Sequence, residues 1–403
     1  MIRKSGLTAL VTAGAMGVLF VPTMTPAHAA GKVGKPGVVA PAATPEATPT
    51  ASPTVTSSPT ASPTPTPTPT VTLASPSLKA LAARTGMAIG NAVSLEALAE
   101  DPNYAKIAAT EFDSVTPENV MKWDATEPER GQFTFAQADA FMKFAETNKQ
   151  KVRGHTLLWH SQVPAWVTEG TWTKAELTEV MRQHISAVAG RYKGRIWQWD
   201  VLNEAFNEDG TYRDTIWYRV IGPEYVQLAF KFAHEADPKA LLFYNDYNIE
   251  GVNPKSDAVY AMVKQLKAKK IVIHGVGVQG HLSTEYDVPG SMPANLARFA
   301  KLGLFTAVTE ADVRSVLPMT PAKRQAQAAG YNIMLASCLA EKKCISFTLW
   351  GFTDKYQWVP GVFTGEGYAA LYDENYQSKP ATDAVRLLLT LAPSGKPRGV
   401  VKK

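Results

Sequence analysis

The chain has 403 residues, of which 45% are hydrophobic and 19% are charged, with a net charge of +5. The hydrophobic content excludes wholesale disorder. The small positive surplus gives no electrostatic reason to expect a nucleic-acid partner.

Residues 1–29 have the pattern of a secretory signal peptide. Arg3 and Lys4 precede an apolar run over 7–21, and Ala27-His28-Ala29 supplies small residues on either side of a cleavage site. A membrane anchor is the alternative, but the run contains threonines and glycines and ends at Pro22, short of about 18 residues. We therefore expect a secreted, extracellular protein, with no membrane span after the leader is cleaved.

Residues 30–77 predict a disordered spacer. Ten prolines fall between Pro41 and Pro76, among Thr, Ser and Ala, and Glu46 is the one charged residue from 41 to 77. Proline removes amide donors and favours extended conformations, and such a segment cannot bury a core. The spacer is either a tail that holds the domain away from a surface or the remnant of a lost module, and the sequence does not distinguish the two.

Residues 78–395 predict one domain, with a short basic tail over 396–403. Short apolar or β-rich runs alternate with segments of helical periodicity, which favours parallel βα units. Eight such runs favour a closed (β/α)8 TIM barrel, and no G-x-G-x-x-G pattern follows a strand to support a dinucleotide fold. The expected strands are Met87–Ile89, Phe112–Val115, Val152–His155, Ile196–Leu202, Leu241–Tyr244, Gly275–Gln279, Phe305–Thr309 and Ile345–Leu349. The clearest expected helices are Phe135–Asn148, Lys174–Tyr192, Pro223–Ala236, Lys255–Lys270 and Ala322–Glu341.

Acids, amides, imidazoles and indoles follow six of the expected strands. In such barrels the active site lies at the carboxyl ends of the strands, so these groups are expected to converge. Any one of them could instead cap a helix or pack in the core, but six strand ends carrying such groups are hard to explain that way. They are Glu118, Asn119 and Lys122; His155, Trp159 and His160; Asn203 and Glu204; Gln279 and His281; Glu310 and Asp312; and Trp350 with Trp358.

Two carboxylates on different strand ends suit glycoside hydrolysis. That reaction needs an acid for the leaving oxygen and a carboxylate that meets the oxocarbenium-like centre. Indoles suit stacking on sugar rings. A metal hydrolase is disfavoured because His155 and His160 have no spacing typical of metal ligands, and G-x-S-x-G is absent. We expect no metal and no cofactor.

Several longer motifs resemble the family 10 glycoside hydrolases, which are endo-β-1,4-xylanases on a (β/α)8 barrel. The resemblance runs from about Leu78 to Leu391, in the order expected for the family. The motifs are TPENVMKWDATEP (116–128), RGHTLLWHSQ (153–162), WDVLNEA (199–205), YNDYN (244–248) and LWGFTD (349–354).

The resemblance implies a retaining mechanism, with Glu204 as the general acid/base and Glu310, in VTEAD (308–312), as the nucleophile. It implies that Asp200 orients His155 and that Asp312 orients His281. The implied substrate-binding residues are Glu118, Asn119, Lys122, His155, Trp159, Asn203, Gln279, His281, Trp350 and Trp358. Two positions depart from the family pattern: Ala311 stands where Leu is usual, and Gly280 where Ser is usual.

Cys338 and Cys344 are the two cysteines of the chain. In an exported protein they are expected to form a disulfide that closes a short loop before an apolar strand. A catalytic thiol or a metal site is disfavoured because the chain has no other cysteine and its seven histidines are scattered.

The expected protein is thus a monomeric secreted endo-1,4-β-xylanase whose partner is the polysaccharide xylan. Two alternatives remain: a barrel that binds polysaccharide without cleaving it, and a retaining β-1,4-glucanase of the same family. Xylose lacks the C6 hydroxymethyl group of glucose, so Trp350, Trp358 and Lys122 would decide whether glucose fits.

Overall fold

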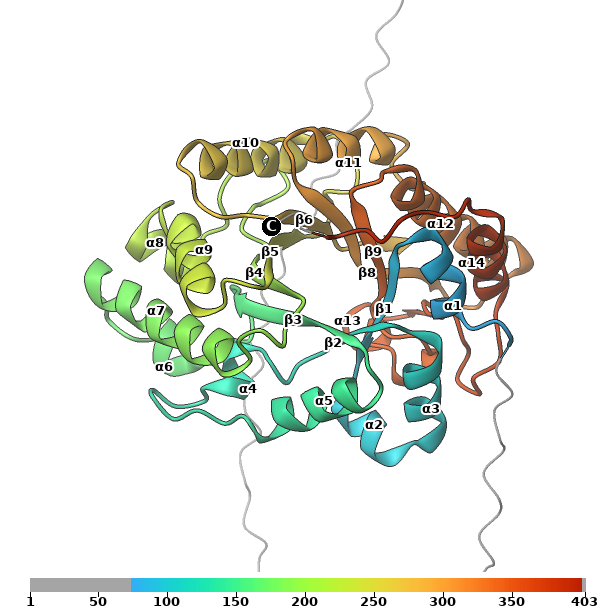
Figure 1. Ribbon diagram of the computed structural model, residues 1–403, viewed down its shortest axis with the longest axis horizontal. Helices are drawn as coiled ribbons and strands as arrows, with labels where there is room; N and C mark the ends of the chain where they lie inside the picture. Colours follow the sequence, from blue (N-terminus) through green and yellow to red (C-terminus); the bar gives the residue numbers. More distant parts are fainter. Residues whose placement is uncertain (1–73, 401–403) are drawn as a thin grey trace, which may run out of the picture. The chain divides into compact units, whose positions relative to one another are not determined.

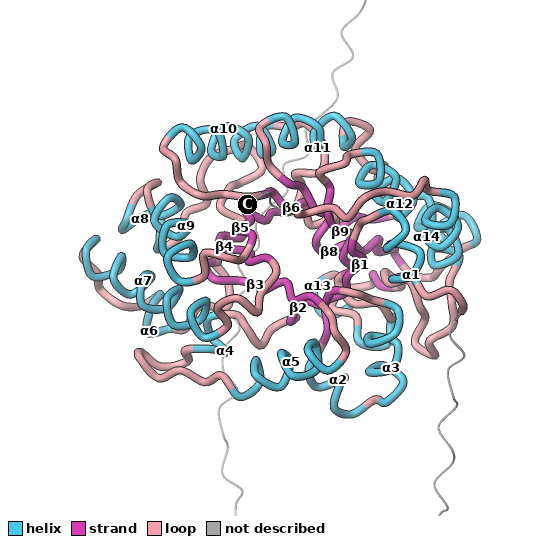
Figure 2. The backbone as a smooth tube through the Cα atoms, viewed as in Figure 1, coloured by secondary structure: helices cyan, strands magenta, loops and turns pink. Residues whose placement is uncertain are grey.

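The computed structural model describes residues 74–400. The predicted leader and nearly all of the predicted spacer lie outside the described residues. Within the described part, a ring of strands is surrounded by helices (Figures 1 and 2), and the first helix begins at Leu78 with Ser77 as its N-cap.

Eight parallel strands within residues 74–400 close into a barrel. They pair in the order β1, β2, β3, β4, β5, β6, β8, β9, and β9 returns to β1. Each predicted strand overlaps one of them, so the predicted (β/α)8 TIM barrel is confirmed. The strands are β1 (Ala88–Val93), β2 (Ser114–Pro117), β3 (Lys151–Leu158), β4 (Gln198–Asn203), β5 (Leu241–Asp246), β6 (Gly275–Val278), β8 (Phe305–Val316) and β9 (Cys344–Leu349), with the short β7 (His281–Ser283) and β10 (Glu366–Gly367) paired to β8.

The helices alternate with the strands and cover the outside of the barrel (Figure 2). Local capping explains several of their starts: α7, for example, begins after Thr173, whose side chain accepts from the backbone of Glu176 in a capping box. The five helices predicted from periodicity correspond to α5, α7, α9, α10 and α12. The helices are α1 (Leu78–Thr85), α2 (Leu95–Glu100), α3 (Pro102–Glu111), α4 (Trp123–Thr126), α5 (Ala136–Thr147), α6 (Ala165–Thr168), α7 (Lys174–Arg191), α8 (Ile216–Ile221), α9 (Tyr225–Ala236), α10 (Pro254–Ala268), α11 (Met292–Lys301), α12 (Pro321–Ala340), α13 (Val359–Val362) and α14 (Pro380–Leu391), with the 3-10 turn η1 (Asp354–Tyr356).

The predicted disulfide is present between Cys338, near the end of α12, and Cys344, the first residue of β9. The carboxyl-terminal segment also packs on this loop. The guanidinium of Arg398, in the predicted basic tail, donates to the carbonyl oxygens of Cys338, Glu341 and Cys344. The chain is therefore bound to the barrel at least as far as Arg398.

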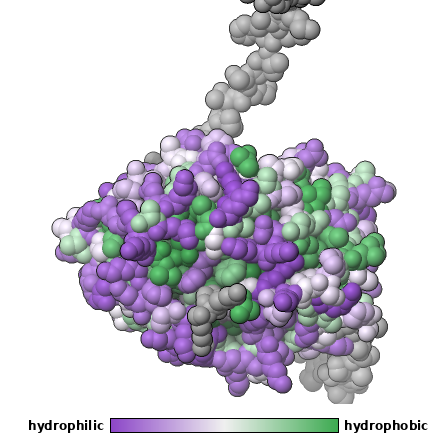
Figure 3. Space-filling model, turned by 45° about the horizontal axis from the view of Figure 1, so that its top comes forward, coloured by the Kyte–Doolittle hydropathy of each residue, from purple (hydrophilic) through white to green (hydrophobic). Residues whose placement is uncertain are grey.

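The face drawn in Figure 3 is mostly hydrophilic, with hydrophobic patches between the polar residues. Scattered apolar side chains of this kind are normal on a protein surface. None of the helices within residues 74–400 combines the length and the apolar character needed to cross a membrane.

Candidate active site

A cleft of about 770 Å³ opens at the carboxyl ends of the barrel strands. The two predicted catalytic glutamates and all ten predicted substrate-binding residues line it, so the structure brings every one of them together. The cleft is lined by Glu118, Asn119, Lys122, His155, Trp159, Gln162, Asn203, Glu204, Tyr247, Asn248, Gln279, His281, Tyr286, Glu310, Arg314, Trp350, Trp358, Val362 and Phe363.

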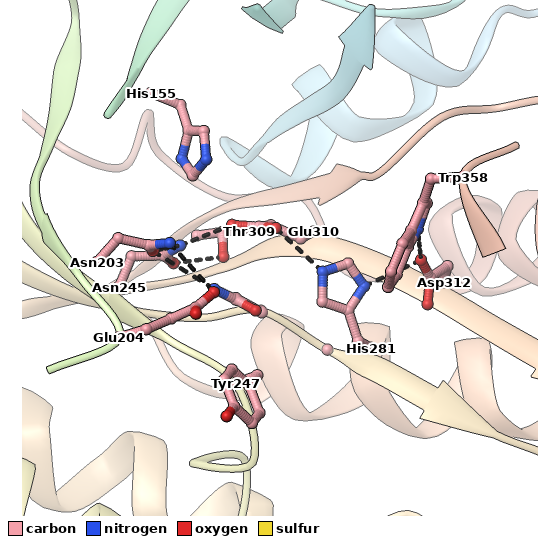
Figure 4. Close-up of polar contacts among 12 residues, drawn as sticks. His155, Asn203, Glu204, Asn245, Tyr247, His281, Thr309, Glu310, Asp312 and Trp358 are labelled. Atoms are coloured by element: carbon pink, nitrogen blue, oxygen red, sulfur yellow. Dashed lines mark hydrogen bonds and ion pairs between the residues drawn. The ribbon is translucent and has the colours of Figure 1, made fainter. Parts of the chain in front are cut away.

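Glu310 lies on β8 and is almost completely buried. Its Oε2 is 3.0 Å from His281 Nε2, and its Oε1 accepts from Asn245 Nδ2 at 2.7 Å (Figure 4). Burial alone would raise the pKa of Glu310, but the hydrogen bond from His281, the charges of His155 and His281 and the amide of Asn245 lower it to about 2. Glu310 is therefore ionised at neutral pH, as a nucleophile must be.

His281 lies between two carboxylates. Its Nδ1 is 2.9 Å from Asp312 Oδ2, an oxygen that also accepts from Trp358 Nε1 at 2.8 Å. Burial would lower the pKa of His281, but Asp312 and Glu310 raise it to about 10. The imidazole is thus a cation at neutral pH and donates from both nitrogens. The predicted orientation of His281 by Asp312 agrees with these contacts.

Glu204 follows the last residue of β4 and is more exposed than Glu310. Its Oε1 accepts from Gln279 Nε2 at 3.0 Å and from Asn203 Nδ2 at 3.2 Å. Its Oε2 accepts from Trp159 Nε1 at 2.9 Å. Three N–H donors thus fix the carboxyl group in the cleft while leaving it accessible to a substrate oxygen.

A chain of amides connects the two glutamates. Asn245 Nδ2 donates to Glu310 and, at 2.8 Å, to Asn203 Oδ1, and Asn203 in turn donates to Glu204 (Figure 4). Thr309 Oγ1 donates to Asn245 Oδ1 at 2.7 Å, so the oxygen of this amide faces Thr309 and its nitrogen faces Glu310. A Cβ at Gly277 would come within 2.4 Å of Asn245 Oδ1, so glycine is needed there.

A buried cation lies on another wall of the cleft. Lys122 Nζ donates to Asn119 Oδ1 at 2.9 Å and to Gln162 Oε1 at 2.6 Å, and it lies 5.0 Å from the centre of the Trp159 ring. Burial lowers the pKa of Lys122 and raises that of Glu118. This group of amide, ammonium and carboxylate beside an indole suits the hydroxyls and the apolar face of a sugar.

Asp200 lies behind His155 and contacts its ring, which is compatible with the predicted orienting role. His155 Nδ1 is 3.0 Å from Asp200 Oδ2, and the same buried carboxylate pairs with the guanidinium of Arg153. The rings of His155 and Trp350 form an edge-to-face pair, with 5.1 Å between the ring centres. Arg153 was not predicted as a supporting residue, although it lies two positions before His155 in the quoted motif.

Sequence reasoning missed several residues of the site. Gln162, Asn245, Tyr247 and Asn248 stand inside quoted motifs, which was a signal that could have found them. Thr309 directly precedes Glu310. Tyr286, Arg314, Val362 and Phe363 line the same cleft but belong to a loop, to the end of β8 and to the end of the short helix α13, where no spacing or residue type marked them.

The acidic, imidazole and thiol side chains form no metal site in the part of the chain that the structure describes. Within residues 74–400, no group of three or more His, Cys, Asp or Glu side chains is arranged to hold a metal ion. The cleft brings two carboxyl groups together with imidazoles, amides and indoles.

Comparison with known proteins agrees with this geometry. Residues 77–387 match Glycosyl hydrolase family 10. The Endo-1,4-beta-xylanase 1 of Gibberella zeae is 46% identical over 279 residues, which cover 67% of this chain and 79% of that relative. The native xylanase 10B of Thermotoga maritima superposes with a TM-score of 0.76 at 45% identity, covering 78% of this chain and 98% of that chain. The xylanase 10B of Thermotoga petrophila, solved in complex with xylobiose, gives a TM-score of 0.77 at 44% identity, covering 79% and 98%. The resemblance seen in the sequence motifs is confirmed, and the chain belongs to glycosyl hydrolase family 10.

Proposed function

We propose that this protein is a secreted endo-1,4-β-xylanase that cleaves internal xylosidic bonds of xylan with retention of anomeric configuration. Glu204 is the general acid/base and Glu310 is the nucleophile. The observation that carries the proposal is that two carboxyl groups share one cleft in contrasting environments. Glu310 is buried against the His281 cation, whereas Glu204 is more exposed and meets neutral N–H donors.

The first step forms a covalent glycosyl-enzyme. A carboxylate oxygen of Glu310 attacks the anomeric carbon, the glycosidic C–O bond breaks, and Glu204 gives its proton to the departing oxygen. The amide of Asn245 and the imidazolium of His281 hold Glu310 in a fixed orientation for the attack. Asn203, which lies between the two glutamates, is placed to bind the sugar 2-hydroxyl.

The second step releases the sugar. Glu204, now a carboxylate, takes a proton from water as the water oxygen attacks the anomeric carbon, and the bond to Glu310 breaks. Two inversions at one carbon give net retention. Lys122, Asn119 and Trp159 hold the neighbouring sugar, and the names of the relatives and the xylobiose complex of the Thermotoga petrophila enzyme support a xylose-based substrate.

The assignment of roles is tested by rescue with azide. Glu204→Ala and Glu310→Ala should each lose at least 1,000-fold in kcat/KM on xylan. With 2,4-dinitrophenyl β-xylobioside, whose leaving group departs without a proton, azide should restore turnover to both variants, giving β-xylobiosyl azide with Glu204→Ala and α-xylobiosyl azide with Glu310→Ala. Glu235→Ala, which removes an exposed carboxylate on α9, is the control and should keep full activity. Wild-type activity in either active-site variant would refute the roles.

Two further measurements test the substrate and the stereochemistry. Wild-type enzyme should release xylo-oligosaccharides from xylan and act far more slowly on soluble cellulose; the reverse preference would point to a glucanase, and binding without cleavage to a non-catalytic barrel. Proton NMR should find the β-anomer as the first product, and an α-configured first product would exclude retention.

Export rests on the basic start, the apolar run and the Ala27-His28-Ala29 site of the sequence. The mature protein recovered from a culture medium should begin at Ala30 by mass spectrometry. Recovery only inside the cells, with the leader intact, would contradict export.

A further inference from the structure

The backbone of Glu204 has an unusual conformation that is held from three sides. Its φ angle is +57°, in the left-handed region that costs a non-glycine residue free energy. The N–H of Glu204 donates to the carbonyl of Asn245 at 2.9 Å, and its own carbonyl accepts from Arg213 Nε at 3.0 Å. The next N–H, that of Ala205, donates to the hydroxyl of Tyr244 at 3.0 Å.

The Tyr244 hydroxyl accepts this bond as a neutral phenol whose own proton is donated to another group. Tyr244 is fully buried on β5, and burial raises its pKa well above the ordinary value. Its one proton is donated to Asp246 Oδ2, so a lone pair is left to accept from Ala205. Removal of the hydroxyl would take away the hydrogen-bond donor to Asp246 Oδ2 and the acceptor for the Ala205 N–H.

Asp246 is anchored in turn by a buried cation. Burial raises the pKa of Asp246 to about 7, against the opposing charge of Lys255. Lys255 Nζ lies 3.0 Å from Asp246 Oδ1, and its side chain is fully buried. The same ammonium lies 3.0 Å from Glu208 Oε1 and 3.4 Å from the centre of the Tyr247 ring.

These groups stand behind the reacting centre. Tyr244, Asp246 and Lys255 are absent from the lining of the cleft, while Glu204 and Tyr247 form part of it. The YNDYN segment thus sends Tyr247 and Asn248 to the substrate side and Tyr244 and Asp246 to the far side of Glu204. A buried ion pair such as Asp246–Lys255 need not stabilise the fold. A role in orienting Tyr244 would explain why the pair is there.

We infer that Tyr244 and Asp246 are positioning residues for the acid/base: they hold the peptide after Glu204 in its left-handed conformation and so aim the Glu204 carboxyl at the glycosidic oxygen. The inference rests on the role proposed for Glu204. Loss of the Tyr244 hydroxyl lets this peptide relax, and the carboxyl moves away from the leaving oxygen. A misplacement of about 1 Å can cost roughly 100-fold in rate.

The test uses leaving groups that differ in their need for a proton. In Tyr244→Phe, kcat/KM should fall about 10- to 100-fold for xylan and for phenyl β-xylobioside. For 2,4-dinitrophenyl β-xylobioside, whose leaving group departs without an acid, kcat/KM should stay within about threefold. The matched control is Tyr192→Phe. Tyr192 is also buried and donates to a carboxylate, that of Asp139, but it lies at the end of α7 outside the barrel. Tyr192→Phe should lower the melting temperature while leaving kcat/KM unchanged for both aryl substrates.

Parallel variants separate the possible failures. Asp246→Asn keeps an oxygen acceptor for Tyr244 and should show the same dependence on leaving group in milder form; it carries the test if Tyr244→Phe does not fold. If Glu204→Ala itself loses no more on the phenyl than on the dinitrophenyl substrate, the proposed acid/base fails. If Glu204→Ala shows the dependence and both Tyr244→Phe and Asp246→Asn lose equally on the two substrates, only the positioning role is overturned.

Discussion

His281 Nε2 lies 3.0 Å from Glu310 Oε2 in the floor of the cleft, and the two groups are held as a cation and an anion. The opposite nitrogen of the ring contacts Asp312. One imidazolium therefore contacts two carboxylates. Glu310 is the proposed nucleophile, whereas Asp312 does not line the cleft.

The first prediction concerns the charge of His281. Because Asp312 and Glu310 raise its pKa to about 10, both ring nitrogens should carry protons throughout the range from pH 6 to 9. Nitrogen-15 NMR of the histidine side chains should show one imidazole with both nitrogens protonated at pH 8, and His281→Gln should remove that signal. A His281 that titrates near pH 6.5 would contradict the ion pair.

The second prediction concerns the acid side of the activity profile. Loss of the His281 cation removes a group that lowers the pKa of Glu310, while burial, which raises it, remains. A raised pKa means that Glu310 becomes protonated, and so inactive, at a higher pH. In His281→Gln the acid limb of kcat/KM should move upward by more than one pH unit. An unmoved limb, with activity lowered equally at every pH, would contradict this coupling.

The third prediction tests how the amide of Asn245 is oriented. Thr309→Val removes the hydroxyl that donates to Asn245 Oδ1, so the amide can flip and turn its oxygen toward Glu310. We expect kcat/KM to fall about tenfold, the scale of one lost hydrogen bond to a charged group. Thr306→Val is the control, because Thr306 is a buried threonine of the same strand whose hydroxyl has no hydrogen-bond partner among the described residues. Equal losses in the two variants would reject the orienting role.

The barrel could be predicted from sequence because its signal is local and repeated. Each expected strand is a short apolar or β-rich run, such as Leu241–Tyr244. The residues that follow the strands meet at the same end of the barrel because the strands are parallel. The two glutamates proposed as catalytic were predicted by the same logic together with motif resemblance, and the structure brings them into one cleft. The left-handed backbone of Glu204 carried no such signal, since its φ depends on contacts with β5, which lies far along the chain, and with Arg213 in the loop after β4.

The contributions of loops were harder to predict. Val362, the last residue of α13, and Phe363, which follows it, reach the cleft, as does Tyr286 from the segment after β7. Where a loop side chain points depends on packing between distant segments, and neither composition nor periodicity encodes it. Asn245 and Thr309 were overlooked for another reason: they are buried polar residues inside strands, where the sequence alone suggests core packing.

The fourth prediction concerns Gly280, which stands where the family usually has Ser. Gly280 has a φ angle of +80°, and a Cβ there would lie 3.0 Å from Met334 Sδ and 3.2 Å from Val308 Cγ1. Gly280→Ala should therefore cost about 1–2 kcal/mol of stability for the left-handed backbone alone and should lower kcat by shifting the adjacent Gln279 and His281. Gly303 has a similar φ of +85°, but the nearest atom to a Cβ there would be Lys267 Nζ at 3.8 Å, and Gly303 does not line the cleft. Gly303→Ala should therefore lose stability while keeping kcat. An unchanged kcat in Gly280→Ala would contradict the prediction, because it would mean that Met334 and Val308 move aside without shifting Gln279 and His281.

The fifth prediction concerns the disulfide between Cys338 and Cys344. It closes a loop of sequence separation 6, and for so short a loop the chain-entropy contribution is about 2 kcal/mol. The double variant Cys338→Ala/Cys344→Ala should therefore unfold about 3 °C lower than wild type, measured by calorimetry without reductant. Because the loop joins α12 to β9 on the side where Arg398 binds it, away from the cleft residues, kcat/KM should be unchanged. Reduction of wild-type protein should reproduce the same shift in melting temperature, whereas a variant that loses activity at full stability would mean that this loop reaches the active site.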